Sequence, residues 1–89
     1  MRITTANINA LLVQEDIEGL IDAGAPSDEY SDEAAQIAAA LLQLDHEQLT
    51  EDIILSTVSL IWIKSFELSV QDMKLRIPAL QRVTRLILE

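Results

Sequence analysis

The 89-residue chain has no cysteine and only two glycines, two prolines and three aromatic residues. Without cysteine it can form neither disulfides nor thiolate metal sites, and thiol catalysis is excluded. The low glycine and proline content excludes a collagen-like or low-complexity polymer. Hydrophobic residues make up 49% of the chain, which is too high a share for a disordered protein. They are mainly Leu, Ile and Ala, and this mixture favours helix.

Basic residues are scarce and unevenly placed. The chain has six Lys and Arg residues and fifteen Asp and Glu residues, so the net charge is −9. Residues 1–52 carry twelve acids and one base, whereas residues 53–89 have a net charge of +2. The acidic part would repel nucleic-acid phosphates and anionic lipids, and five bases without an aromatic platform make a poor nucleic-acid site. We therefore expect no nucleic-acid binding. The bases of the second part are expected either to neutralise acids within one fold or to be solvated on a helix face.

Long apolar runs are also absent. The longest uncharged stretch after Asp52 is Ile53–Ile63, whereas a membrane span needs about 20 residues. The segment Met1–Thr5 does not lead into the apolar run of a signal peptide. A chain of this length supplies one hydrophobic core. The sequence thus predicts one domain, residues 1–89, in the cytoplasm and without membrane contact.

Apolar spacing predicts the first helix over about Thr4–Ala23. The spacing widens before Ile17, which indicates a break at Asp16, where the carboxylate could cap a short turn. Gly24 should end the helix in a left-handed conformation, and Pro26 should prevent its continuation. Residues 25–31 form the loop that follows.

Three further helices complete an all-α bundle of four main helices. The second begins at Ser31, and the third opens at Asp45 with a capping box and runs to about Phe66. Within it, Ile53–Ile63 is apolar almost all round and must be enclosed on most sides. A buried strand is the alternative there, but the uninterrupted length favours helix.

The last helix begins after Ser69, with Asp72 completing a second capping box. Its apolar stripe continues past Pro78. Because proline removes one helical hydrogen bond and clashes with the preceding turn, a helix kinked or split at Pro78 is predicted.

Few side chains are candidates for chemistry. The single histidine, His46, is expected at the surface beside two acids, with a role as general base as the alternative. The densest acidic cluster is Asp28, Glu29, Asp32 and Glu33. It lacks the twelve-residue spacing of an EF-hand, so helix capping and solvation are favoured over divalent-cation binding. No catalytic, cofactor-binding or metal-ligating residue is assigned.

The aromatic residues are expected to be structural. Tyr30 stands between acids at a loop–helix junction, where its ring can pack on the core and its hydroxyl can bind a neighbour. Trp62 and Phe66 are four residues apart on the third helix and should join the core, or anchor a protein interface if they are exposed. The interaction candidates are therefore Asp28, Glu29, Tyr30, Trp62 and Phe66.

One segment carries a recognisable pattern. Residues 24–30 read Gly-Ala-Pro-Ser-Asp-Glu-Tyr, followed by Glu33 and Ile37 in the next helix. In this pattern the chain resembles a family of small bacterial helical domains of unknown function. The family tends to have Asp-Pro where this chain has Asp16-Ile17. The resemblance implies an all-helical fold and no established activity, and it transfers no catalytic residue.

Two functional hypotheses follow. The first is a small, non-catalytic interaction or regulatory protein that forms a homodimer, because a helix apolar on nearly every side is hard to enclose within one copy. In that dimer the acidic first part would face the basic last helix across a two-fold axis. The alternative to the dimer is a monomer whose four helices surround the third one completely. The second is an immunity or antitoxin protein whose acidic surface masks a basic toxin active site. An enzyme is disfavoured, because no nucleophile, base and orienting group can be assembled.

Overall fold

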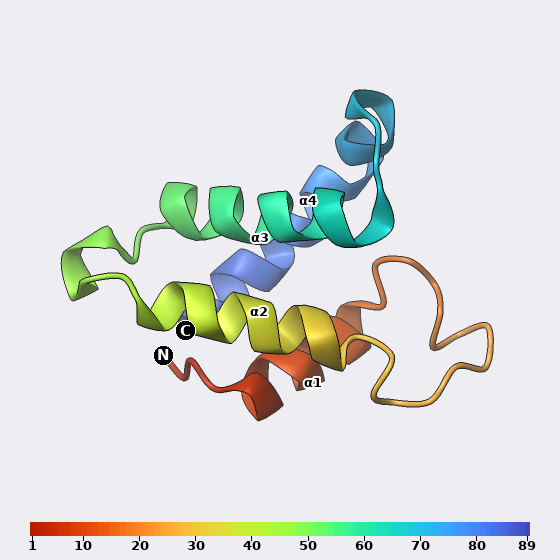
Figure 1. The fold of residues 1–89 in the computed structure, drawn as a ribbon, viewed down its shortest axis with the longest axis horizontal. Coiled ribbons are helices and arrows are strands. Elements are labelled where there is room, and N and C mark those ends of the chain that lie inside the picture. Colours follow the sequence, from red (N-terminus) through yellow and green to blue (C-terminus); the bar gives the residue numbers. More distant parts are fainter.

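Four α-helices and one short 3-10 helix account for the regular structure of the chain. The computed structural model describes all 89 residues and contains α1 (Thr5–Glu15), α2 (Ser31–Leu42), α3 (Glu51–Phe66) and α4 (Val70–Leu88) (Figure 1). The 3-10 helix η1 (His46–Gln48) lies between α2 and α3. There is no strand, so the all-α prediction is confirmed and the strand alternative for the third segment is wrong.

The first helix is shorter than the sequence predicts. It ends at Glu15 rather than near Ala23, because Asp16 adopts a left-handed conformation with φ of 47°. The Asp16 N–H still donates to the Leu12 carbonyl at 2.8 Å, which closes the helix. The wider gap between apolar residues ahead of Ile17 in the sequence did indicate this break at Asp16. Gly24 has the expected positive φ of 105°, but it closes a turn rather than a helix.

The third helix begins five residues later than predicted, with Thr50 rather than Asp45 as its cap. The Asp45 N–H does donate to Gln48 Oε1 at 2.9 Å, yet this cap serves only the single turn η1. The chain then becomes extended at Thr50, with ψ of 162°, and Thr50 Oγ1 accepts the Ile53 N–H at 3.3 Å. Thr50 is therefore the residue that starts α3.

The last helix is a single element. Ser69 and Asp72 form the predicted capping box, with reciprocal hydrogen bonds of 3.0 and 3.1 Å. Pro78 lies inside the helix, so a split into two helices is wrong. Because proline has no N–H, the Lys74 carbonyl lacks its usual helical partner. A kink at this point stays a prediction.

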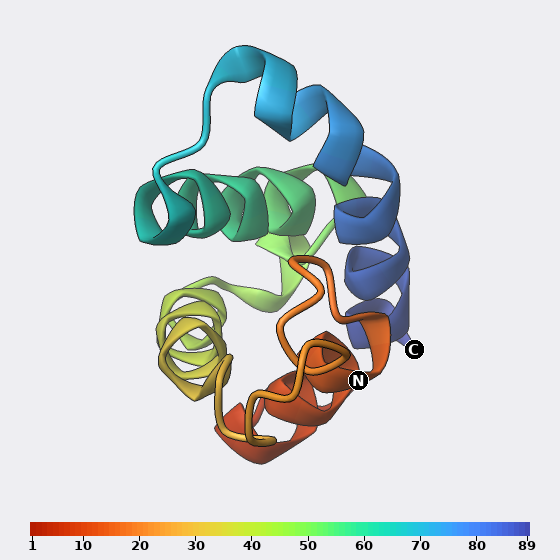
Figure 2. The same ribbon diagram turned by 90° about the vertical axis from the view of Figure 1, so that its right-hand side faces the viewer.

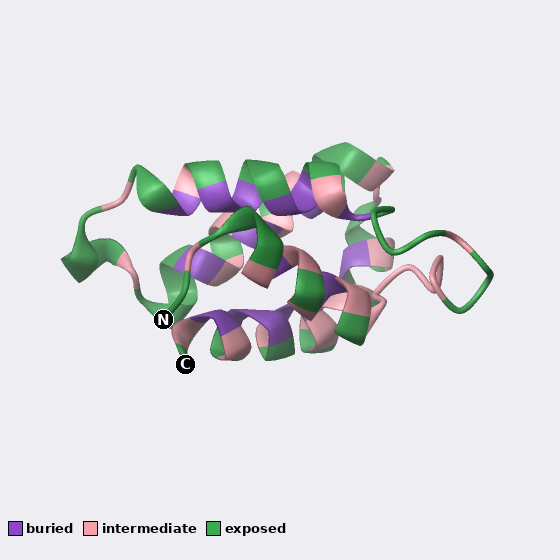
Figure 3. Cartoon of the chain, turned by 90° about the horizontal axis from the view of Figure 1, so that it is seen from below, coloured by how far each residue is buried: buried purple, intermediate pink, exposed green.

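The helices form a closed ring in which each packs against two others. α1 contacts α2 and α4, and α3 contacts the same two helices, as the end-on view shows (Figure 2). Buried residues form stripes along the inward faces (Figure 3). None of the helices has the length and apolarity needed to cross a membrane.

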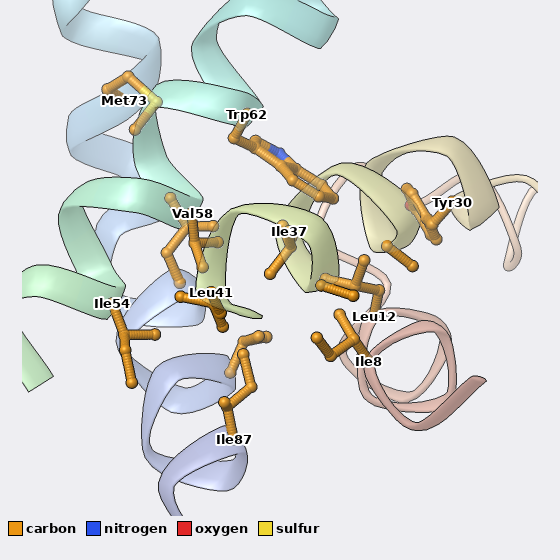
Figure 4. Packing of buried hydrophobic residues seen from close by; sticks show 14 residues of the cluster. Ile8, Leu12, Tyr30, Ile37, Leu41, Ile54, Val58, Trp62, Met73 and Ile87 are labelled. Atoms are coloured by element: carbon orange, nitrogen blue, oxygen red, sulfur yellow. The ribbon is translucent and has the colours of Figure 1, made fainter. Parts of the chain in front are cut away.

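A single cluster of 14 buried hydrophobic residues fills the ring (Figure 4). Its members are Ile8, Leu12, Tyr30, Ala34, Ile37, Ala38, Leu41, Ile54, Val58, Trp62, Met73, Leu80, Val83 and Ile87. The inward face of α3 contributes Ile54, Val58 and Trp62, but Leu60 on the opposite face is 68% exposed. The expectation that α3 is enclosed on most sides is therefore not met within one copy.

Candidate functional site

The most elaborate group of polar contacts lies where the turn segment 16–30 meets α3 and α4. Tyr30 is fully buried, and its hydroxyl donates to Asp16 Oδ1 at 2.7 Å. The same hydroxyl oxygen accepts the N–H groups of Glu18 at 3.2 Å and Leu20 at 3.4 Å. One side chain thus binds three points of the segment that precedes it. We call Asp16, Glu18, Tyr30, Trp62 and Arg76 the Tyr30 cluster.

Asp16 organises the beginning of the segment. Its carboxylate accepts the N–H of Ile21 at 3.0 Å and of Asp22 at 2.9 Å, besides the Tyr30 hydroxyl. Desolvation opposes ionisation of Asp16, but these hydrogen bonds together outweigh it and hold the pKa below its usual value. Burial, together with the bond to Asp16, raises the pKa of Tyr30 to about 12. Tyr30 is therefore a neutral donor at physiological pH.

Glu18 connects the segment to both C-terminal helices. Its Oε2 accepts the Trp62 indole N–H at 2.8 Å and the Arg76 Nε–H at 2.7 Å, and its Oε1 accepts Arg76 Nη2–H at 2.9 Å. The two arginine bonds form a bidentate fork, the stronger geometry for such a pair. The Arg76 hydrogen bond lowers the pKa of Glu18 against the effect of burial, and Trp62 adds to it. Only 11% of the Glu18 side chain is exposed, so the pair is shielded from solvent.

All three aromatic residues of the chain meet beside these carboxylates. The ring centres of Trp62 and Phe66 are 4.8 Å apart, and Tyr30 lies 5.7 Å from Trp62 and 6.4 Å from Phe66. Tyr30 and Trp62 are fully buried, as expected for structural residues, whereas Phe66 is partly buried. Because Tyr30 and Trp62 lie inside one copy, neither can anchor a partner in this conformation.

The acidic candidates are not brought together into a site. Asp28 and Glu29 are exposed and form no ion pair, and no group of three or more carboxylate or imidazole side chains is close enough to hold a metal ion. Glu33 is different, because its side chain is largely buried in the first turn of α2 without a cation. Burial raises the pKa of Glu33, and the charges of Asp32 and Glu29 add to the shift. His46 is exposed, as predicted.

Three of the four basic residues of α4 pair with acids of the same chain, as one of the two interpretations of these bases predicts. Arg82 pairs with Glu15 at 2.6 Å, and Arg85 pairs with Glu51 at 3.2 Å, in addition to the Arg76–Glu18 pair. The hydrogen bond to Glu15 raises the pKa of Arg82. Lys64 and Lys74 form no ion pair.

Sequence reasoning missed the roles of Glu18 and Arg76. Glu18 and Arg76 are 58 residues apart, and no local pattern joins them. The single available signal was the widened apolar spacing at Asp16, which marks the start of the segment but not its distant contacts. The cluster as a whole fixes the turn segment to α3 and α4, and every carboxylate in it is occupied by donors.

Comparison of the chain with protein-family models, with curated proteins and with solved structures found no match. The resemblance based on residues 24–30 therefore stays a prediction. The fold is that of a small, all-helical protein, and the Tyr30 cluster joins its turn segment 16–30 to α3 and α4.

Proposed function

We propose that the protein is a non-catalytic, cytoplasmic interaction module that forms a homodimer through the outer face of α3. The observation that carries this proposal is an exposed apolar row on that face, Ile53, Leu60 and Ile63, which are 38%, 68% and 36% exposed. We call these residues the outer α3 row. Contiguous apolar surface on a soluble domain marks an interaction site more often than scattered exposed leucines do.

The spacing of the outer α3 row suits pairing with a second copy. Residues seven and ten positions apart fall on one side of a helix, and the row extends over about 15 Å. If two α3 helices lie antiparallel about a two-fold axis, the Ile53 turn of one copy lies beside the Ile63 turn of the other. Leu60 then lies opposite the small residue Ser56. A two-fold interface requires this kind of self-complementarity.

The charges do not support the electrostatic part of the dimer hypothesis. Arg76, Arg82 and Arg85 are engaged with acids of their own chain, so α4 has few bases left to face an acidic surface across an axis. Two copies with a net charge of −9 each repel one another. The dimer therefore rests on apolar contact, and added salt should strengthen it by screening the repulsion.

A non-catalytic role is supported by the state of the candidate groups. The two carboxylates of the Tyr30 cluster accept several hydrogen bonds each, and the Tyr30 hydroxyl is held neutral by its surroundings. His46 lies on the surface away from this cluster. No nucleophile, base and orienting group come together in the fold.

Sedimentation equilibrium at micromolar concentration tests the homodimer. We expect a mass near twice 9.9 kDa for the parent chain and near 9.9 kDa for Leu60→Glu. Leu75→Glu is the matched control, because Leu75 is also exposed but lies on α4. A parent mass near 9.9 kDa, or equal dissociation by both variants, would contradict the α3 interface. Trp62→Glu should instead unfold the chain, since Trp62 is buried within one copy.

A second candidate function is masking of a basic toxin site, as an immunity or antitoxin protein does. It is favoured by the exposed acids Asp22, Asp28, Glu29 and Asp32, none of which is paired within the chain. Affinity purification of the tagged protein from its native host tests this idea. Recovery of a strongly basic nuclease, released by moderate salt, would favour it over the homodimer alone.

A further inference from the structure

An open pocket of about 490 Å³ lies at the end of the molecule where the two termini meet. It is lined by Met1, Ile3, Leu42, His46 and Leu49, so four hydrophobic side chains surround one imidazole. In Figure 1 both termini lie beside the C-terminal end of α2, and the η1 turn follows next to them. We call this feature the terminal pocket. Its size falls in the range of ligand and side-chain pockets.

Hydrogen bonds hold two sides of the terminal pocket in place, although its lining is mostly apolar. The Met1 ammonium donates to a main-chain oxygen of Glu89 at 3.2 Å, which fixes the N-terminal wall against the end of α4. The Gln48 side chain accepts the Asp45 N–H and fixes the η1 wall. Leu42 is 67% exposed, in contrast to the neighbouring core residue Leu41. Met1, Leu42 and His46 are exposed, whereas Ile3 and Leu49 are partly buried against the core.

Two exposed acidic residues adjoin the lining residue His46 in the chain. Asp45 and Glu47 flank His46 in the chain, and both are exposed and free of ion pairs. Arg2, which lies between the lining residues Met1 and Ile3 in the chain, is the one basic neighbour of the lining, and the Met1 ammonium donates to Glu89. The surroundings of the terminal pocket are therefore negative at neutral pH, which disfavours fatty acids, phosphates and acidic peptides.

We propose that the terminal pocket binds one large aliphatic side chain of a protein partner whose neighbouring residues are Lys or Arg. The aliphatic side chain fills the apolar floor, and the flanking cations meet Asp45 and Glu47. A desolvated apolar anchor inside a charged rim is the arrangement that dominates many protein interfaces. Charge complementarity around the rim supplies orientation and speeds association.

The proposal is tested with a synthetic peptide in which one leucine is flanked on both sides by lysines. Titration of ¹⁵N-labelled protein should shift the amide signals of Leu42, His46 and Leu49, while those of the outer α3 row stay in place. Replacing the peptide leucine by serine should weaken binding about tenfold, which corresponds to the loss of one buried aliphatic side chain. Replacing the lysines by glutamates should abolish binding, and added salt should weaken it.

Two protein variants make the test specific to this surface. Leu42→Ser should weaken peptide binding about tenfold, and Glu47→Gln should weaken it and reduce its salt dependence. Leu75→Ser and Glu29→Gln are the matched controls, because they remove an exposed leucine and an unpaired acid elsewhere. Both controls should bind the peptide like the parent.

Several results would overturn the proposal. Absence of binding near millimolar peptide would do so, because even a weak anchored contact is detectable there. Equal binding of the leucine and serine peptides would mean that charge attraction alone binds the peptide, without an anchored leucine. Signal shifts confined to the outer α3 row would place the peptide on the other surface. If the chain self-associated and both Leu42→Ser and Leu75→Ser abolished that self-association, the occupant of the terminal pocket would be the Lys74–Leu75 segment of a second copy.

Discussion

The two connections on either side of α2 are fixed in different ways. The turn segment 16–30 is held by side chains from α3 and α4, which reach it across 44 and 58 residues of sequence. The connection 43–50 is held by bonds within itself, chiefly between Asp45 and Gln48. The first connection is consequently part of the tertiary structure, whereas the second is a local turn. This difference explains why the first carries buried polar groups and the second borders an open pocket.

The largest effect should come from Tyr30. Tyr30→Ala removes a fully buried ring that also binds Asp16, so we expect a loss of about 2–4 kcal/mol in the free energy of unfolding. Tyr30→Phe keeps the ring and removes only the hydroxyl, and about 1–2 kcal/mol should be lost. Chemical denaturation followed by circular dichroism measures both values. An unchanged midpoint for Tyr30→Ala would mean that the segment is not held by this residue.

Glu18→Gln should have the next largest effect. It weakens the fork to Arg76 and leaves a partly buried guanidinium without its counter-charge, at a cost of about 1–3 kcal/mol at pH 7. The pKa of Glu18 is lowered in the folded state, so its contribution is present above the unfolded pKa and is lost as the pH falls through the folded pKa. The parent should thus lose stability below about pH 4, and the variant should lose less.

Glu33→Gln should stabilise the protein at neutral pH. Burial raises the pKa of Glu33 in the folded state, so its favourable contribution exists below the unfolded pKa and is lost as the pH rises through the folded value. The neutral glutamine avoids this loss, and the thermal midpoint should rise at pH 7 but not below about pH 4. Glu29→Gln, at an exposed position, is the control. A lower midpoint for Glu33→Gln at pH 7 would show that the charge is needed.

The smallest effect should come from Gln48→Ala in the local connection. It removes one capping hydrogen bond at an exposed turn, so we expect a loss of about 0.5–1 kcal/mol. Hydrogen exchange sharpens the comparison, because the Asp45 amide should exchange faster than the Ile21 amide that Asp16 binds. Equal protection of these two amides in the parent protein would remove the contrast between the two connections.

Local signals were sufficient for most of the fold but not for the candidate site. The Ser69–Asp72 capping box was predictable because it depends on residues three positions apart. The start of α2 at Ser31 was predictable because Asp32 and Glu33 occupy its first turn. The end of α1 was misplaced because helical apolar spacing resumes at Ile17, Leu20 and Ile21 after the gap at Asp16. The backbone leaves the helix there because its carboxylate gains two N–H donors and the Tyr30 hydroxyl. Such contacts exist only after folding.

The surface properties were predictable only in part. The segment Ile53–Ile63 was identified as apolar on nearly all sides, but its sequence could not show which side the other helices cover. Likewise, the bases of α4 were expected to meet acids of the first part, yet the pairing of Arg76 with Glu18 and of Arg82 with Glu15 depends on how the ring closes. Amino-acid type indicates the kind of contact, and topology decides the partner.

The closed ring of helices also has a consequence for synthesis on the ribosome. α1 is made first, but one of its two neighbours is α4, the last helix to emerge. Glu15 and Glu18 meet Arg82 and Arg76 only after α4 has emerged, because these partners follow them by 67 and 58 residues in the chain. α1 and α2 can pair early as a hairpin. The inner faces of this hairpin therefore stay uncovered until α3 and α4 have been made, and the complete core forms only after α4 has emerged.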